Sequence, residues 1–160
     1  MADKSAEKTN VMRLLDQKKI AYDWHRLEGA EGLTGVQIAQ RLGLDPSCGF
    51  KTLVTEAASK KYYVFIVPVA MELDLKKAAK VTHEKWIEMI PQKELLPLTG
   101  YVHGGCSPIG MKKRFPAFIH ESAASFPAIR ISGGKVGVQV ELSLADLKKM
   151  VPVTEADIAS

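Results

Sequence analysis

The order of hydrophobic and polar positions divides the chain into short helical and strand-like segments. Apolar residues at helical spacing predict a first helix from about Thr9 to Lys18. Thr34 has the side chain of a helix N-cap and Gly43 is a typical helix end, so a second helix is expected between them. Three further helices are predicted: after Asp74, at about 91–96, and after Ser143, where Asp146 forms a capping-box pattern.

Alternation of apolar and polar residues predicts strands in the remaining segments. These strand-like runs are 21–27, 50–57, 62–68, 117–121, 128–132 and 135–142. A short link joins the second and third runs, which predicts a hairpin. The strands cluster in two blocks and do not alternate regularly with helices, as they would in a parallel sheet. The expected fold class is therefore α+β, with a mixed, barrel-like sheet of about six or seven strands surrounded by short helices.

Length and composition narrow the class of protein. We expect the 160 residues to form one domain, 1–160, with a core at about 8–150 and loose ends at the first seven and last five residues. The start, "MADKSAEKTN", lacks the apolar core of a signal peptide, and the longest apolar run has about half the length of a membrane span. Two widely spaced cysteines indicate reduced thiols and a cytoplasmic location. The net charge of +4 is a mild bias toward anionic partners, with an inert basic surface equally open.

A protein nucleophile or a metal site finds little support in the sequence. Cys106 lies near His103 in a glycine-rich loop, but a structural cysteine is the favoured interpretation. Ser107 precedes Pro108 and so lacks the context of a serine nucleophile. The four histidines are scattered without metal-ligand spacing, so no metal and no cofactor are expected.

Two glycine-rich segments are better candidates for ligand binding. "SGGKVG" (132–137) reads as a β-turn on its own, although it contains G-x-x-G. "GYVHGGCSPIGMKKRF" (100–115) could direct backbone N–H groups at an anion, and its basic end could hold phosphates. Together they favour a nucleotide or an RNA 3′ end as the ligand. Lys51, on a strand beside Leu53, either extends to water or lines the same site.

Several motifs together resemble one family over about residues 8 to 150. They are "FKTLV" (50–54), "PVAMELDLKKAAK" (68–80), "TGYVHGGCSPIGMKKRFP" (99–116) and "ISGGKVGVQVEL" (131–142). Their order and spacing resemble the YbaK/EbsC family of free-standing aminoacyl-tRNA deacylases, which are related to the editing domain of bacterial prolyl-tRNA synthetase. The resemblance implies a mixed β-barrel decorated with helices. It also implies removal of a wrong amino acid, typically cysteine, from Cys-tRNA(Pro) or also Cys-tRNA(Cys), with prolyl-tRNA synthetase as a transient partner.

The resemblance also assigns roles to residues of this sequence. The essential lysine of the family corresponds to Lys51, the catalytic candidate. The substrate-binding candidates are Thr52, Gly104, Gly105, Ser132, Gly133 and Gly134. The basic candidates for tRNA phosphate contacts are Lys112, Lys113 and Arg114. In this family the thiol of the substrate cysteine is thought to attack its own ester, so the enzyme would position the ester and stabilise charge at its carbonyl, with backbone N–H groups of Gly104, Gly105 and Gly133 facing it.

Three positions depart from the family pattern and bear on the amino acid that is removed. Aromatic residues of some relatives correspond here to Leu27 and Thr34, and an acidic residue corresponds to Gln139. The alternatives are therefore water attack on another misacylated tRNA such as Ala-tRNA(Pro), and a non-catalytic module that binds tRNA or a synthetase. A regulator of cell-surface protein synthesis is a further option, suggested by the EbsC name.

Overall fold

The computed structural model describes residues 8–160, so the expected loose segment at residues 1–7 lies outside the described residues. Its α-helices are α1 (Asn10–Gln17), α2 (Gly35–Leu42), α3 (Leu75–Thr82), α4 (Leu95–Thr99) and α5 (Leu144–Met150). The 3₁₀ turns are η1 (Pro46–Cys48), η2 (Gln92–Glu94) and η3 (Glu121–Ser125). The strands are β1 (Asp23–Arg26), β2 (Phe50–Ala57), β3 (Tyr62–Pro68), β4 (Ile87–Met89), β5 (Ala117–His120), β6 (Ile129–Ser132), β7 (Val138–Leu142) and β8 (Val153–Ala156).

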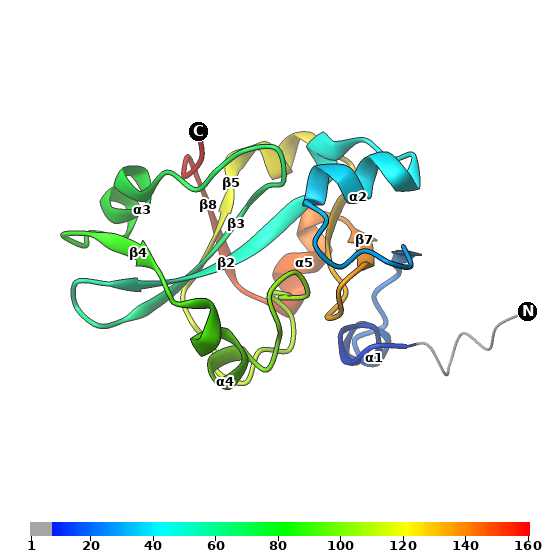
Figure 1. Cartoon of the computed structure of the whole chain (residues 1–160), viewed down its shortest axis with the longest axis horizontal. Helices are drawn as coiled ribbons and strands as arrows, with labels where there is room; N and C mark the ends of the chain where they lie inside the picture. Colours follow the sequence, from blue (N-terminus) through cyan, green and yellow to red (C-terminus); the bar gives the residue numbers. More distant parts are fainter. Residues whose placement is uncertain (1–7) are drawn as a thin grey trace, which may run out of the picture.

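The strands form two sheets (Figure 1). One has the order β4-β2-β3-β5-β8 and the other the order β1-β7-β6. β5 runs parallel to both of its neighbours, and the remaining pairs are antiparallel, so the first sheet is mixed. This confirms the α+β class with a mixed sheet. The described residues contain eight strands rather than six or seven, and the closed barrel stays a prediction.

The predicted hairpin is confirmed with its boundaries. β2 and β3 pair from Phe50 opposite Pro68 to Glu56 opposite Tyr62. A tight turn joins them, in which the Ala57 N–H donates to the Lys61 carbonyl. Hydrogen bonding to β4 on one side and β5 on the other makes this hairpin the centre of the larger sheet.

The predicted helix starts are confirmed at the level of single hydrogen bonds. Thr9 Oγ1 accepts the Met12 N–H, and Thr34 forms a full capping box with Gln37. Asp74 accepts two backbone N–H groups at the start of α3. Ser143 Oγ accepts the Asp146 N–H, while the Asp146 carboxylate pairs with Lys149 instead of completing a capping box. Local side-chain chemistry therefore sets where these helices begin.

The C-terminus differs from the expected loose end. Ile158 and Ala159 are buried, and Glu72 and Ser160 exchange two backbone hydrogen bonds of 3.0 Å. The Asp74 N–H also donates to the Ile158 carbonyl. The expectation was wrong because two apolar residues carry no periodicity, yet the tertiary fold provides them with a hydrophobic site beside α3.

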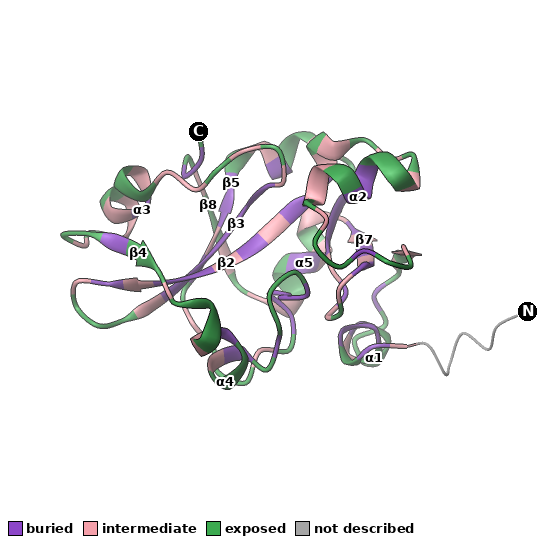
Figure 2. Ribbon diagram, in the orientation of Figure 1, coloured by how far each residue is buried: buried purple, intermediate pink, exposed green. Residues whose placement is uncertain are grey.

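Residues of the large sheet belong to two hydrophobic clusters. Figure 2 shows the buried residues along β2 and β3. The main cluster includes Val11 and Leu15 of α1, Ile66 of β3, Val140 of β7 and Leu147 of α5. The second includes Phe65 and Val67 of β3, Ala78 of α3 and Ile158 near the C-terminus. Both faces of the central hairpin are therefore covered along much of its length. Within residues 8–160, no helix is long and apolar enough to cross a membrane.

Candidate functional site

Lys51 is the second residue of β2 and lies between the buried residues Phe50 and Thr52. Its side chain is 30% exposed, and its Nζ is 3.4 Å from a carboxylate oxygen of Glu72, which is 85% exposed. An ion pair with so exposed a partner contributes little to stability and can be replaced by a ligand. The Lys51 ammonium is thus held by a half-buried stem while remaining available to an incoming anion or carbonyl group.

Thr52 faces the other side of the same strand. Its side chain is buried on the side of Phe50 and Val54, which belong to the main core. Its Oγ1 has no hydrogen-bond partner among the described residues. Because successive side chains of a strand point to opposite faces, Lys51 and Thr52 do not approach a ligand from the same side.

The start of β2 lies beside β6. Gly49 forms a parallel bridge with Arg130, and β2 and β6 are in contact. Lys51 follows Gly49 by two residues and Ser132 follows Arg130 by two residues, so both candidates come shortly after the bridge. Arg130 was not predicted as a site residue. It is buried and donates from Nη2 to the Asp45 carbonyl at 2.6 Å, which ties η1 to β6.

The two glycine-rich segments pack against each other. A Cβ placed on Gly105 would lie 3.1 Å from the Lys135 carbonyl carbon and from the Val136 nitrogen, so a larger residue would require the 132–137 turn to shift by a few tenths of an ångström. Gly134 has a φ of +99°, a left-handed conformation that favours glycine. The sequence predicted both segments as candidates, and the structure places them side by side.

The backbone N–H groups of Gly104, Gly105 and Gly133 were all expected to face the ester carbonyl, but two of them form hydrogen bonds within the protein. The Gly105 N–H donates to the Val102 carbonyl at 3.0 Å, and the Gly133 N–H donates to the Val138 carbonyl at 2.8 Å. Both N–H groups already donate to a carbonyl of the protein, as buried backbone donors must, so they are not available to a ligand. Within residues 8–160, the Gly104 amide makes no hydrogen bond, so it alone of the three is available to a ligand.

Ser132 can act both within the turn and toward a ligand. Its Oγ accepts the Gly134 N–H at 3.1 Å, which leaves the hydroxyl proton available to donate. Gln139 lies directly opposite Ser132 on β7, and its buried Oε1 has no partner among the described residues. His25 of β1 follows in the same cross-strand row and pairs with Glu141 at 3.1 Å. A polar face therefore continues from Ser132 across the smaller sheet.

The surroundings of Cys106 disfavour it as a nucleophile at neutral pH. Burial raises the pKa of its thiol to about 12, although a hydrogen bond with Thr99 acts in the opposite direction. His103 is exposed while Cys106 is buried, and no hydrogen bond joins them. Ser107 is fully buried, and its Oγ accepts the Ile109 N–H. Among residues 8–160, no three His, Cys, Asp or Glu side chains form a group that could hold a metal ion.

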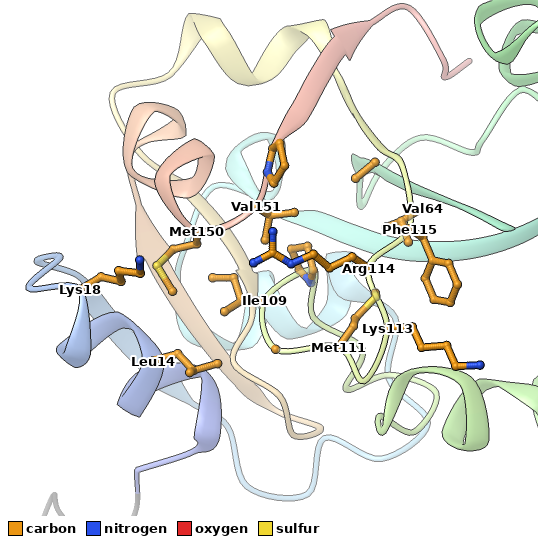
Figure 3. Close-up of a pocket in the computed structure, with 14 residues that line it drawn as sticks. Leu14, Lys18, Val64, Ile109, Met111, Lys113, Arg114, Phe115, Met150 and Val151 are labelled. Carbon is orange, nitrogen blue, oxygen red and sulfur yellow. The ribbon is translucent and has the colours of Figure 1, made fainter.

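The three consecutive cations Lys112, Lys113 and Arg114 are exposed, but their side chains have different surroundings. Lys113 and Arg114 line a pocket of about 270 Å³ next to α1 and α5, which Figure 3 shows in close-up. Lys112 does not line this pocket, and its stem lies about 3.4 Å from the Cβ position of Gly100. The three cations expected to contact phosphates therefore do not form one equivalent group.

Comparison with known proteins identifies the class to which this fold and site belong. Residues 30–150 match the family model of the aminoacyl-tRNA editing domain. This match covers more than half of the chain, and the chain therefore belongs to the aminoacyl-tRNA editing domain family.

A relative from Enterococcus faecalis, provisionally named as the Cys-tRNA(Pro)/Cys-tRNA(Cys) deacylase EbsC, is 43% identical over 141 residues. The alignment covers 88% of this chain and 86% of the relative. A solved structure described provisionally as a trans-editing enzyme for prolyl-tRNA synthetase matches with a TM-score of 0.83 and 22% identity, over 100% of this chain and 99% of the other. A protein described as hypothetical gives a TM-score of 0.85 at 18% identity, over 95% and 100% of the two chains. These structural matches establish the fold.

Proposed function

We propose that this protein is an aminoacyl-tRNA deacylase that removes cysteine from mischarged tRNA(Pro), and from Cys-tRNA(Cys) as a further substrate. The observation that supports the proposal is a pair of adjoining features in a chain of the editing family: the bridge between Gly49 and Arg130, just before Lys51 and Ser132, and the contact between the two glycine-rich segments. The name of the 43% identical relative specifies the same substrates. The basic surface suits an RNA ligand.

The chemistry needs no nucleophile from the protein. The sulfur of the substrate cysteine attacks its own ester carbonyl, a C–S bond forms, and the bond from that carbon to the ribose oxygen breaks. The thiol proton ends on the ribose oxygen, and the products are tRNA with a free 3′ end and a cyclic thioester that water then opens. The buried, protonated thiol of Cys106 is consistent with a protein that supplies no nucleophile of its own.

The protein's part in this scheme is to hold the ester and stabilise developing charge. The Lys51 ammonium anchors the terminal adenosine or the aminoacyl group. The Gly104 N–H donates to the ester carbonyl, and the Ser132 hydroxyl donates to a ribose hydroxyl. Gly105, Gly133 and Gly134 shape the turns, and Thr52 supports the strand that carries Lys51.

The wider assignments belong to the same proposal. Lys112, Lys113 and Arg114 contact phosphates of the acceptor stem. Prolyl-tRNA synthetase is a transient partner, and deacylation takes place in the cytoplasm. Residues 1–160 act as a single editing domain whose two sheets approximate a barrel.

The deciding experiment compares tRNA(Pro) carrying cysteine, alanine or serine. We expect release of cysteine far faster than the other two, because only cysteine carries a thiol that can attack. Lys51→Ala should lower the rate at least about 100-fold, because the ester loses the group that positions it. Glu72→Ala is the matched control and should stay within about twofold, because an exposed ion pair contributes little.

Other outcomes would point to the alternatives. Equal release of all three amino acids would favour attack by water, for which the neutral, unpartnered Gln139 in place of an acid is the supporting observation. Binding of tRNA without release of any amino acid, and with little loss in Lys51→Ala, would identify a non-catalytic binding module.

A further inference from the structure

A pocket of about 270 Å³ lies between α1, the 108–117 segment and the end of α5 (Figure 3). Its walls are mainly apolar and include Leu14, Val64, Ile109, Met111, Phe115 and Met150. The thioethers are polarisable and adaptable, and the aromatic ring offers an apolar face, so these walls suit a flat ring as a ligand. None of the residues that carry the proposed reaction lines this pocket.

The polar side chains around the pocket are all cationic. Lys18, Lys113 and Arg114 line it, and no carboxylate does. Figure 3 shows the Arg114 side chain extended across the pocket toward Val151 and Ile109, with Lys18 on the opposite side near Met150. A ligand in the pocket therefore meets mainly apolar walls together with cationic side chains.

The positive charge at the pocket is not neutralised by the fold. Within residues 8–160, Lys18, Lys113 and Arg114 form no ion pair. Some lysines just before α1 and within α5 do form ion pairs: Lys8 pairs with Asp16, Lys148 with Glu155 and Lys149 with Asp146. Three cationic side chains that form no ion pair therefore line the pocket, which favours an anionic group on the ligand.

We propose that this pocket binds one nucleotide of the single-stranded acceptor end of the RNA. The base occupies the apolar interior, and the phosphate lies between Lys18 and Arg114. A nucleotide combines a flat ring and an anionic group, which this pocket accommodates together. The inference rests on the proposed function for the source of the nucleotide.

Chain continuity supports the same assignment. The segment 100–115 packs its glycine half, Gly104 and Gly105, against the 132–137 turn, and its basic half forms a wall of the pocket. One segment therefore connects the proposed ester site with the pocket. An RNA end held by the pocket would be fixed relative to the glycine turns by a short stretch of protein.

The test is direct binding of 5′-CMP, 5′-AMP and the nucleoside cytidine, followed by NMR chemical shifts and by calorimetry. We expect both nucleotides to shift resonances of Ile109, Met111 and Met150, and cytidine to bind at least about tenfold more weakly. Lys18→Glu and Arg114→Glu, on separate elements, should each weaken nucleotide binding by about tenfold or more. Lys19→Glu is the matched control, because Lys19 follows Lys18 but does not line the pocket; it should change affinity less than about threefold.

A second arm distinguishes a free nucleotide from the RNA end. Uncharged tRNA(Pro) with its single-stranded 3′ end should shift the same resonances, and the same tRNA trimmed of that end should not. Equal binding of cytidine and 5′-CMP, an equal loss in Lys19→Glu, or no shift at the pocket with any probe would overturn the proposal. Nucleotide binding at the pocket in a protein that releases no amino acid would reject the proposed function and leave the pocket assignment standing.

Discussion

Cys106 and Cys48 show how strongly surroundings decide the chemistry of one residue type. Cys106 is buried, and the pKa of its thiol is raised to about 12, whereas Cys48 is partly exposed on η1. The thiolate is the reactive form, so at neutral pH Cys106 is inert in the folded protein. At the scale of residues, position in a glycine loop does not by itself make a nucleophile.

We predict that Cys106→Ala retains the deacylation rate within about threefold, because the thiol takes no part in the reaction. A thiol-alkylating reagent should label Cys48 in the folded protein and Cys106 only after unfolding. Mass spectrometry of the labelled peptides and the rate of the alanine variant check both statements. A variant without activity that remains folded would show that this sulfur does take part.

At the scale of elements, the contact between the glycine loop and the 132–137 turn is the feature most sensitive to change. Gly105→Ala would place a Cβ 3.1 Å from the backbone of Lys135 and Val136, and neither backbone atom can move without shifting the turn. We expect a loss of about 1–3 kcal/mol in the free energy of unfolding and a marked fall in deacylation rate.

Gly32→Ala is the control for that variant. Its Cβ would meet nothing within 4 Å, and its φ of +80° imposes only the strain of a left-handed alanine, about 1 kcal/mol. The two variants should both lose stability, while only Gly105→Ala loses activity. Urea denaturation and the deacylation rate measure the two effects separately, and equal activity in both variants would contradict the importance of this contact.

Two residues of the glycine-rich loop 100–115, Tyr101 and Cys106, make the free energy of unfolding fall at alkaline pH. Burial raises the pKa of Tyr101 from 10.0 to about 12 and that of Cys106 from 9.0 to about 12. The folded state thus holds both protons more tightly than the unfolded chain does. The stability this provides is fully present below the unfolded values and is lost as the pH rises toward about 12.

Urea denaturation at a series of pH values from about 8 to 11 should therefore show a falling free energy of unfolding. Cys106→Ala should reduce this slope, because it removes one of the two groups. Tyr101→Phe removes the other, together with the hydrogen bond that its hydroxyl donates to the Ile109 carbonyl. A slope unchanged in both variants would mean that other groups are responsible.

At the scale of the whole molecule, the C-terminal residues complete the second hydrophobic cluster. Ile158 is fully buried beside Phe65, Val67 and Ala78. We expect Ile158→Ala to lower the free energy of unfolding by about 2–5 kcal/mol and Ile158→Val by about 0.5–1.5 kcal/mol, because the cost follows the volume removed.

Asp157→Ala is the matched surface control. Asp157 is exposed and pairs with Lys77 at 3.0 Å, so its loss should cost at most about 1 kcal/mol. The midpoints of urea denaturation, with unchanged slopes, provide the comparison. A cost for Ile158→Ala no larger than that of Asp157→Ala would show that the chain end does not support the core.

The sequence by itself determined the local elements of this protein. The caps at Thr9, Thr34 and Asp74, and the β2–β3 hairpin, depend on side chains and turns within a few residues of each other, so patterns in the chain reveal them. The same holds for the two glycine-rich segments as candidates, because glycine marks positions of unusual backbone conformation.

Only the tertiary structure decided which groups meet and which remain free. It placed the start of β2 beside β6 through the Gly49–Arg130 bridge, and it added β4 and β8, whose short runs depend on the neighbouring strands for their hydrogen bonds. It also committed the Gly105 and Gly133 amides to internal bonds and left that of Gly104 available. The physical reason is that such contacts join residues distant in the chain, and their geometry depends on the packing of every element between them.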